Sequence, residues 1–395
     1  MQELATARNA RPDYLKRAAE LAPVLLQGAA HAEQRAELAP AVVDALHAAG
    51  LFRLLLPRWI GGAELDPMSY VAVVEELARH DASAAWCVNQ ATGCSMVVGY
   101  MEKDAAREIL GPRDAVIAWG PSPKARAVAV EGGYRVDYSG MFASGSRHAT
   151  WLGGHCPVFE AGGTQRLNAL GRPEIRTVLF PKASVEVRDA WQVMGLRGTG
   201  SDAFVLQGLF VPERHSLLRD VVSARVDPSP IYGFTANAIY AAGFASVALG
   251  IARSVLDVFV DMAQGKTPRG MIRTLRESGV VQSEVAQCQA KWGAARAYLH
   301  GALAEAWQGA RDEPRPPVDQ RMALRLAATF AIHQAKEVVD TLYDAAGATS
   351  IFESEPFERR FRDIHAVTQQ VQGRKSHFET VGQFMLGLEA DTTWL

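Results

Sequence analysis

The sequence lacks most of the patterns that mark metal sites, disulfide frameworks and membrane segments. Its four cysteines form no CxxC pair and no zinc-like spacing with histidine; they are Cys87, Cys94, Cys156 and Cys288. We therefore expect no metal, and reduced thiols in a cytoplasmic protein, with Cys87 and Cys94 in the core. No run reaches the about 20 apolar residues of a membrane span, and the stretch MQELATARNARPDYLKRAAE lacks the apolar segment of a signal peptide.

An excess of charge of either sign is absent as well. Lys and Arg number 41 and Asp and Glu 43, which leaves a net charge of −2, and the basic residues are scattered. This balance gives no electrostatic reason to expect nucleic acid or an anionic membrane as a partner. The chain does have length: 395 residues predict two or three domains or one multi-layered unit, and no internal repeat divides them.

Helical and β-prone segments alternate in three blocks, which predict domains at 1–114, 115–222 and 223–395. In the first block, apolar residues recur at three- and four-residue steps. This period predicts helices over 12–38, with Pro12 placed to start the helix, over 67–80, and over the buried segment 82–101.

The second block changes to short β-prone segments separated by Gly, Pro, Asp or Asn. It predicts an antiparallel sheet or barrel, with one hairpin turning at Gly132 and Gly133. In the third block the helical period returns and predicts a four-helix bundle. Its expected helices are 238–264, 282–308, 319–347 and the glutamine-rich stretch 362–379.

The motif GLRGTGSD, residues 195–202, invites a phosphate-loop interpretation that its context does not support. A phosphate loop follows a strand and opens a helix, whereas a β-prone run follows here. We expect a connection between strands. The functional alternative is a loop whose Arg197 or Thr199 touches a bound cofactor.

Two further stretches carry polar or aromatic side chains that could face a ligand. FASGSRHATW places Ser144, Ser146 and His148 at alternate positions, which would share one face of a strand. Because no nucleophile elbow or third triad member accompanies them, a polar face or a patch beside a flat ligand is expected. IAWGPSPKA, residues 117–125, could present an indole face to a ring-shaped ligand or be only a turn.

Three stretches together resemble the acyl-CoA dehydrogenase superfamily. They are residues 57–86, 191–212 and 345–367, the last with a glycine segment before an Arg-Asp pair. The resemblance implies an α+β fold with an N-terminal helical domain, a middle antiparallel β-barrel-like domain and a C-terminal four-helix bundle. It also implies a flavin between the β domain and the bundle, in a homotetramer where a neighbouring subunit completes the cofactor site.

The resemblance also implies which residues meet the flavin. Those beside its ring would be Trp119, Gly120, Ser122, Ser144 and Gly145. The loop interpretation above adds Arg197 and Thr199 as candidate cofactor contacts. Those at its phosphate or adenine end would be Lys266, Thr267, Arg269 and Gln282, with Gly347. The loop that carries Lys266 is longer than in the dehydrogenases.

The superfamily contains two chemistries that the last helices help to separate. Dehydrogenases need a carboxylate base, which the usual branch places after the Arg-Asp pair and before a glycine. Here Val371 and Gln372 precede Gly373, and neither side chain can accept a proton. The other branch resembles two-component flavin-dependent monooxygenases, which receive reduced flavin from a separate reductase and add O₂ at its C4a carbon to form a hydroperoxide.

The sequence therefore predicts an oxygenase component acting on a small aromatic or heteroaromatic substrate, such as an indole- or phenol-like ring. Ser144 would hydrogen-bond the flavin, and Gln370 stands where many such oxygenases keep a histidine. The expected substrate-lining residues are Asn89, Gln90, Gln369 and Gln370, and His365 and His377 are alternative catalytic groups. The alternatives are an acyl-CoA dehydrogenase, or other acyl-CoA-acting flavoenzyme, with a displaced base, and a non-catalytic flavin-binding homologue.

Overall fold

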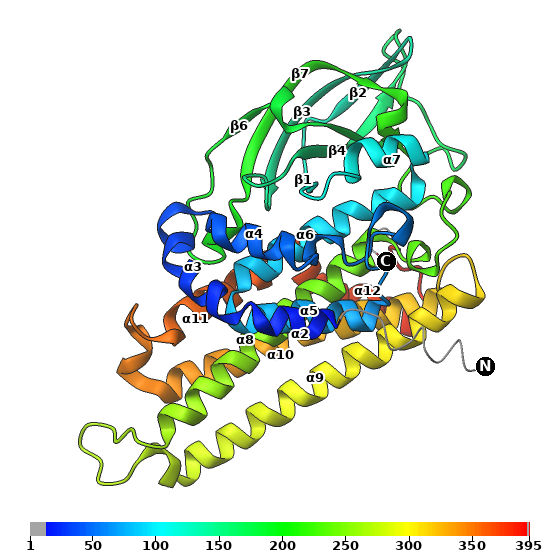
Figure 1. The fold of residues 1–395 in the computed structure, drawn as a ribbon. Coiled ribbons are helices and arrows are strands. Elements are labelled where there is room, and N and C mark those ends of the chain that lie inside the picture. Colours follow the sequence, from blue (N-terminus) through cyan, green and yellow to red (C-terminus); the bar gives the residue numbers. More distant parts are fainter. Residues whose placement is uncertain (1–12, 393–394) are drawn as a thin grey trace, which may run out of the picture.

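The computed structural model describes residues 13–392 and 395. Figure 1 shows a sheet on one side of the molecule, long C-terminal helices on the other, and shorter N-terminal helices between them. Residues far apart in sequence thus meet where the middle layer touches the sheet and the long helices. The predicted order of helices, sheet and helices is confirmed.

The N-terminal helices are short because turn and capping residues interrupt the helical period. Their bounds are α2 (Tyr14–Glu20), α3 (Ala22–Arg35), α4 (Pro40–Ala48), α5 (Pro67–His80), α6 (Ala82–Ser95) and α7 (Lys103–Leu110). The single helix expected over 12–38 is wrong: it divides at Leu21, because Pro23 lies in the first turn of α3. Pro12 lies outside the described residues, and Asp13 caps α2 through a bond from Lys16 N.

The middle block forms one mixed sheet. Its strands are β1 (Ile117–Trp119), β2 (Arg126–Val130), β3 (Gly133–Ala143), β4 (Trp151–Phe159), β5 (Ile175–Pro181), β6 (Glu186–Arg188), β7 (Asp202–Pro212) and β8 (Ser216–Leu217). The order is β6-β7-β3-β2-β4-β5-β8, with β1 also paired to β4. The expectation of a purely antiparallel sheet is wrong, because β4 runs parallel to both β1 and β2. The predicted hairpin exists, with Glu131 and Gly132 as its turn residues.

The C-terminal helices are α8 (Ala236–Ala263), α9 (Gly279–Asp312), α10 (Val318–Ala346), α11 (Pro356–Gln369) and α12 (Ser376–Met385). The first three confirm the predicted long helices. The continuous helix expected over 362–379 is wrong, because Gln370 is extended and a 3-10 turn, η11 (Val371–Gly373), follows it. The Gln370 side chain accepts from Gln372 N at 2.8 Å and so caps this turn instead of continuing α11.

The helix α8 forms the centre of the molecule. By length and composition it could cross a membrane, contrary to the expectation that no run could, but 78% of its most apolar window is buried inside the protein. It packs against α5, α6, α9, α10 and α11. We therefore interpret α8 as a core helix of this fold.

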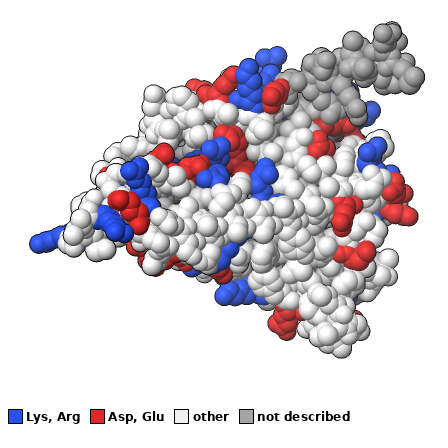
Figure 2. All heavy atoms as spheres, turned by 90° about the horizontal axis from the view of Figure 1, so that it is seen from below, with Lys and Arg blue, Asp and Glu red and all other residues white. Residues whose placement is uncertain are grey.

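On the face shown in Figure 2, acidic and basic side chains are intermixed between broad areas that carry neither.

Close backbone approach between α5 and α8 depends on Gly250. A Cβ atom there would lie 2.4 Å from the Glu75 carbonyl oxygen and 2.6 Å from the Ala78 Cβ. The substitution Gly250→Ala should therefore push the two helices apart and lower the free energy of unfolding by about 1–3 kcal/mol. Denaturant unfolding measures this change.

The matched control is Gly301→Ala on α9, where a Cβ meets nothing within 4 Å. Alanine there should raise the free energy of unfolding by about 0.5–1 kcal/mol, since glycine is a poor helix former. If both alanines stabilise the protein equally, the close approach at Gly250 is not a constraint.

Candidate functional site

Ser144 lies in a turn, not on a strand. The strand β3 ends at Ala143 and β4 begins at Trp151, so the predicted shared strand face of Ser144, Ser146 and His148 is wrong. Ser146 Oγ instead donates to the Gly200 carbonyl at 3.0 Å. The His148 ring packs near Phe52, and burial lowers the pKa of His148 to about 3, so this imidazole stays neutral.

A chain of buried hydrogen bonds runs through Ser144. Trp86 Nε1, on α6, donates to Ser144 Oγ at 3.0 Å. Ser144 Oγ lies 2.7 Å from Ser201 Oγ, which lies 2.7 Å from Thr199 Oγ1. Thr199 Oγ1 donates to the Leu196 carbonyl at 2.8 Å. The GLRGTGSD motif is therefore a connection between strands, as expected, and its hydroxyls reach Ser144.

Proton counting gives this chain a single direction. A hydroxyl has one hydrogen to donate and two lone pairs to accept. Thr199 uses its hydrogen on Leu196, so Ser201 donates to Thr199, and Ser144 must donate to Ser201. Ser144 accepts from Trp86 and keeps one free lone pair. In this arrangement Ser144 can accept a further hydrogen bond but cannot donate one.

The residues expected beside the flavin ring lie around β3 and the turn that follows it. A Cβ at Gly120 would lie 1.7 Å from the Met141 carbonyl, so the end of β1 touches the end of β3. Gly145 N donates to the Thr199 carbonyl at 2.8 Å, which joins the turn to the connection. Ser122 Oγ accepts from Ser139 N at 3.2 Å, further along β3.

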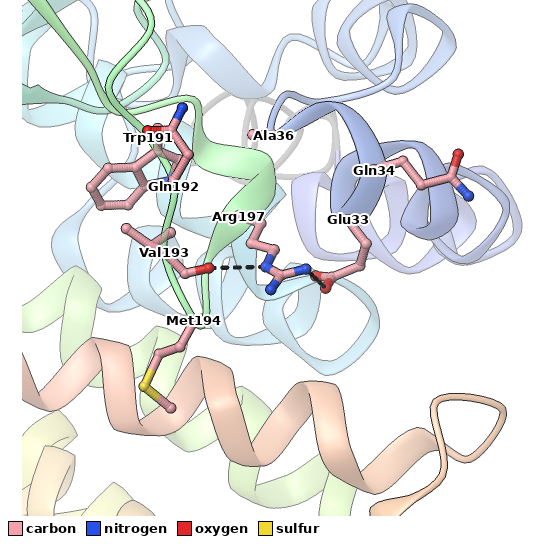
Figure 3. A pocket seen from close by; sticks show the side chains of 8 residues that line it. All are labelled: Glu33, Gln34, Ala36, Trp191, Gln192, Val193, Met194 and Arg197. Carbon is pink, nitrogen blue, oxygen red and sulfur yellow. Dashed lines mark hydrogen bonds and ion pairs between the residues drawn. The ribbon is translucent and has the colours of Figure 1, made fainter.

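Arg197 points away from this group. It lines a pocket of about 480 Å³ with residues of α3 and of the 191–194 segment (Figure 3). Its Nε donates to the Val193 carbonyl at 2.9 Å, and its Nη1 lies 3.6 Å from Glu33 Oε2. Arg197 and Thr199 therefore face different sides of the same turn.

A wall of aromatic rings continues from Ser144 into α8. The Trp86 and Phe244 ring centroids lie 3.9 Å apart, and Phe244 stacks with Tyr240 at 5.9 Å. Tyr240 Oη lies 3.2 Å from Cys94 Sγ, and burial raises the pKa of the Cys94 thiol to about 12. Sequence analysis missed Trp86, Tyr240 and Phe244; the four-residue spacing of the last two on α8 was their only signal.

The expected substrate-lining residues have different hydrogen-bond partners. Gln90 Nε2 donates to the Trp119 carbonyl at 3.3 Å, beside the aromatic wall. Asn89 Oδ1 accepts from Tyr70 Oη within the core. Among the described residues, neither Asn89 Nδ2 nor Gln370 Nε2 has a hydrogen-bond partner, although both are buried. Gln369 is exposed and donates to Thr368 Oγ1.

Gln372, at the position where a dehydrogenase would carry its base, makes a structural hydrogen bond. Gln372 is 2% exposed, and its Oε1 accepts a hydrogen bond from Arg325, whose pKa burial lowers to about 10. His377 Nε2 lies 2.8 Å from the Val371 carbonyl. His365 Nε2 lies 3.0 Å from Asp340 Oδ1. Both histidines thus have structural partners near the C-terminus.

The residues expected at the phosphate or adenine end of the flavin lie far from Ser144 in the molecule. Lys266 Nζ contacts the Ala346 carbonyl and Thr349 Oγ1 near Gly347. Arg269 and Gln282 are exposed on the adjoining loop and on α9. These residues lie beyond the C-terminal end of α8, and the rise per residue from Phe244 to Lys266 places them about 33 Å from the aromatic wall. Figure 1 shows this loop at the opposite end of the molecule from the sheet.

Asp363 fastens the hydrogen-bonded connection to α11. Its Oδ1 accepts from Leu196 N at 2.6 Å, and a Cβ at Gly195 would lie 2.2 Å from the Arg362 carbonyl. Burial raises the pKa of the Asp363 carboxyl to about 6, against the lowering effects of Arg359 and the Leu196 N–H.

Comparison with known proteins gives two family matches. Residues 16–112 match the acyl-CoA dehydrogenase N-terminal domain, and residues 242–373 match the acyl-CoA dehydrogenase C-terminal domain. An indole-3-acetate monooxygenase of Pseudomonas putida is 28% identical over 88% of this chain and 86% of its own. The FADH(2)-dependent resorcinol hydroxylase oxygenase component of Rhizobium sp. (strain MTP-10005) is 28% identical over 94% of each chain.

Among solved structures, 3-HSA hydroxylase from Rhodococcus sp. RHA1 has the same fold. Its TM-score is 0.88, at 24% identity, over 97% of this chain and 99% of the other. The superfamily resemblance and the predicted order of N-terminal helices, middle sheet and C-terminal helices are thereby confirmed.

The carboxyl of Asp363 predicts a pH-dependent stability. Because its pKa is higher in the folded than in the unfolded chain, its contribution is present below about pH 4 and is lost as pH rises through about 6. Asp363→Asn keeps an oxygen acceptor for Leu196 N but cannot ionise. Relative to the wild type, this variant should gain stability between pH 4 and pH 7, by about 1–3 kcal/mol.

Unfolding curves of both proteins at several pH values measure the difference. Asp363→Ala removes the acceptor and should destabilise at every pH. A wild-type-minus-Asn difference that does not change with pH would show that Asp363 does not titrate in this window.

Proposed function

We propose that this chain, which belongs to the acyl-CoA dehydrogenase superfamily, is the oxygenase component of a two-component flavin-dependent monooxygenase. It takes reduced flavin, FADH₂ or FMNH₂, from a separate reductase and uses O₂ to oxygenate a small aromatic or heteroaromatic compound. The names of the two monooxygenase relatives support this proposal. The observation that carries it is the directed hydrogen-bond chain ending at Ser144.

The free lone pair of Ser144 fits a reduced flavin better than an oxidised one. The N5 atom of a reduced flavin carries a hydrogen and donates, whereas N5 of an oxidised flavin only accepts. Since Ser144 can only accept in this arrangement, it matches the reduced form. The neighbouring Met141 and Phe142 expose apolar side chains, and Phe142 is held in a left-handed conformation (φ 60°). These residues offer a surface for a flat ring.

The bound flavin would supply the activation of O₂, and the chain supplies position and exclusion of water. Ser144 would accept from the flavin, and Trp119, Gly120 and Gly145 would surround its ring. Asn89, Gln90 and Gln370 would line the substrate site, the first and last offering amide N–H groups that have no other partner among the described residues. Gln369 is exposed and does not belong to this proposed lining.

The dehydrogenase alternative lacks support at the position that it requires. Proton abstraction beside a thioester needs a basic side chain, and Gln372 is instead an acceptor for Arg325. The test supplies the full chain with reduced flavin and isotopically labelled O₂ over a panel of indoles and phenols. One labelled oxygen atom in the product is expected. Bleaching of bound oxidised flavin by an acyl-CoA, without oxygenation of any ring, would establish the alternative.

A homotetramer in the cytoplasm completes the proposal. Met271, Ile272, Ile351 and Phe352 are exposed near Lys266, and Ile272 is 100% exposed, which is costly unless another subunit covers it. In such an assembly Lys266, Arg269, Gln282 and Gly347 would reach a neighbouring subunit's flavin. We expect a molar mass of four chains in solution, and Ile272→Asp should lower it. A monomer at all concentrations would contradict the proposed homotetramer.

The directed chain predicts discrimination between flavin redox states. In Ser201→Ala, Ser144 loses its acceptor and its hydrogen becomes free to donate to N5 of oxidised flavin. Binding of oxidised flavin should then tighten by roughly three- to tenfold relative to reduced flavin, the range of one ordinary hydrogen bond. Anaerobic titration of both flavin forms measures the ratio of the two dissociation constants.

Ser146→Ala is the matched control, because Ser146 lies in the same turn but bonds to the Gly200 carbonyl outside the chain. It should leave the ratio unchanged. If Ser201→Ala and Ser146→Ala give the same ratio of dissociation constants for the two flavin forms, the direction assigned to the hydrogen-bond chain is wrong.

A further inference from the structure

We propose that Arg219 binds a carboxylate of the substrate, so that the enzyme acts on aromatic acids. This inference rests on the proposed function and narrows its substrate class. A series of contacts connects the guanidinium to Ser144, and Arg219 would hold the acid group while the ring faces the flavin.

Arg219 has the geometry of an unfilled anion site. Its side chain is 15% exposed, and its guanidinium carbon lies 5.6 Å from the Trp119 ring centroid. Its Nε pairs with Asp220 Oδ2 at 3.2 Å. Among the described residues, neither Nη1 nor Nη2 of Arg219 has a hydrogen-bond or ion-pair partner. Those nitrogens form the edge that binds a carboxylate with two parallel hydrogen bonds.

Asp220 positions this guanidinium but does not neutralise its open edge. Asp220 Oδ1 accepts from Ala236 N at 3.1 Å, at the start of α8, and the Asp220 carbonyl accepts from Arg315. The residue itself holds a left-handed conformation (φ 62°). The carboxylate is thus held at the Nε side by its own contacts, and the Nη side stays available.

The titratable side chains packed around Trp119 beside Arg219 are neutral. His155 stacks edge-on against Trp119 at 5.0 Å, and burial, followed by the Arg219 charge, lowers the pKa of His155 well below its usual value. Burial raises the pKa of Cys94 and of Tyr240, so both stay protonated. An entering carboxylate would therefore meet the open edge of Arg219 beside neutral side chains, while the nearby Asp220 and Arg315 are already bonded to other groups.

A continuous line of contacts joins this cation to Ser144. Trp119, under the guanidinium, accepts from Gln90 through its carbonyl, and Gln90 also contacts Cys94. From Cys94 the aromatic wall leads back to Ser144, through Tyr240, Phe244 and Trp86. Gln90 is the one residue of α6 that is not fully buried. An aromatic acid lying along this line would pass Gln90, with its ring on the apolar wall.

The test compares a carboxymethyl-substituted indole or phenol with its uncharged amide, which has the same size. Equilibrium binding to the flavin-free full chain is measured first. The wild type should bind the acid roughly ten- to a hundredfold more tightly than the amide, the range of a charge-assisted hydrogen-bond pair. Arg219→Gln should remove that preference, and Arg219→Lys should retain part of it.

Two controls separate this site from general damage. Arg214→Gln removes an exposed arginine of the same segment, paired to Glu108, and should keep the preference. Binding of reduced flavin should be equal in wild type and Arg219→Gln. Under turnover, Arg219→Gln should raise the KM for the acid and leave the KM for the amide unchanged.

The outcomes distinguish the two proposals. Equal binding of acid and amide by the wild type, or binding of neither, overturns the carboxylate site. A loss of amide binding as large as that of acid binding in Arg219→Gln overturns it as well. Tight, Arg219-dependent binding of the acid without oxygenation of any ring would leave the carboxylate site in place and refute the proposed function.

Discussion

The structure depends on Leu196, which hydrogen bonds hold both within the connection between β6 and β7 and from α11. Its carbonyl accepts from Thr199 Oγ1 and from Trp191 Nε1, and its N–H donates to Asp363 on α11. Leu196 adopts a left-handed conformation (φ 54°), which is unfavourable for a branched side chain and needs such support. Through Thr199 the same node fixes Ser201 and Ser144, and through Ser144 it reaches Trp86 on α6. A shift of α11 would therefore change the position of the Ser144 hydroxyl, which faces the candidate flavin site.

The sequence alone predicted those parts of the fold in which local period and burial agree. The helices α5, α8, α9 and α10 have strong apolar periods and were found nearly to their ends. The stretch after Asp363 failed because its helix-compatible composition conceals a tertiary preference: Gln372 turns inward to Arg325, and Gln370 caps the turn that results. The parallel pairings of β4 failed because strand direction depends on which distant segment lies alongside, and alternation of side chains is identical in both directions.

The candidate site divides along the same line. Motif resemblance predicted Ser144, Gly145 and Trp119 beside the flavin ring, and the loop motif predicted Thr199, since these lie on short segments with fixed spacing; their flavin contacts stay predictions. It did not single out Ser201, Phe244 or Arg219, because their contacts with Ser144, with Trp86 on α6 and with Trp119 on β1 join residues far apart in sequence. The alternation of polar residues also predicted Ser146 and His148 beside Ser144 on a strand face, whereas a turn sends the three side chains to different partners.

The loss of the dehydrogenase base and the direction of the hydrogen-bond chain support one chemistry from two sides. With Gln372 committed to Arg325, the bundle offers no proton acceptor at the position where acyl-CoA oxidation needs one. With Ser144 committed as a donor to Ser201, the β domain offers an acceptor, which suits a flavin that arrives already reduced. An enzyme that reduces its own flavin with substrate must bind the oxidised form first, and this arrangement disfavours that form. The substrate then needs no acidic C–H bond, only a ring held on the apolar wall and a group by which it is oriented.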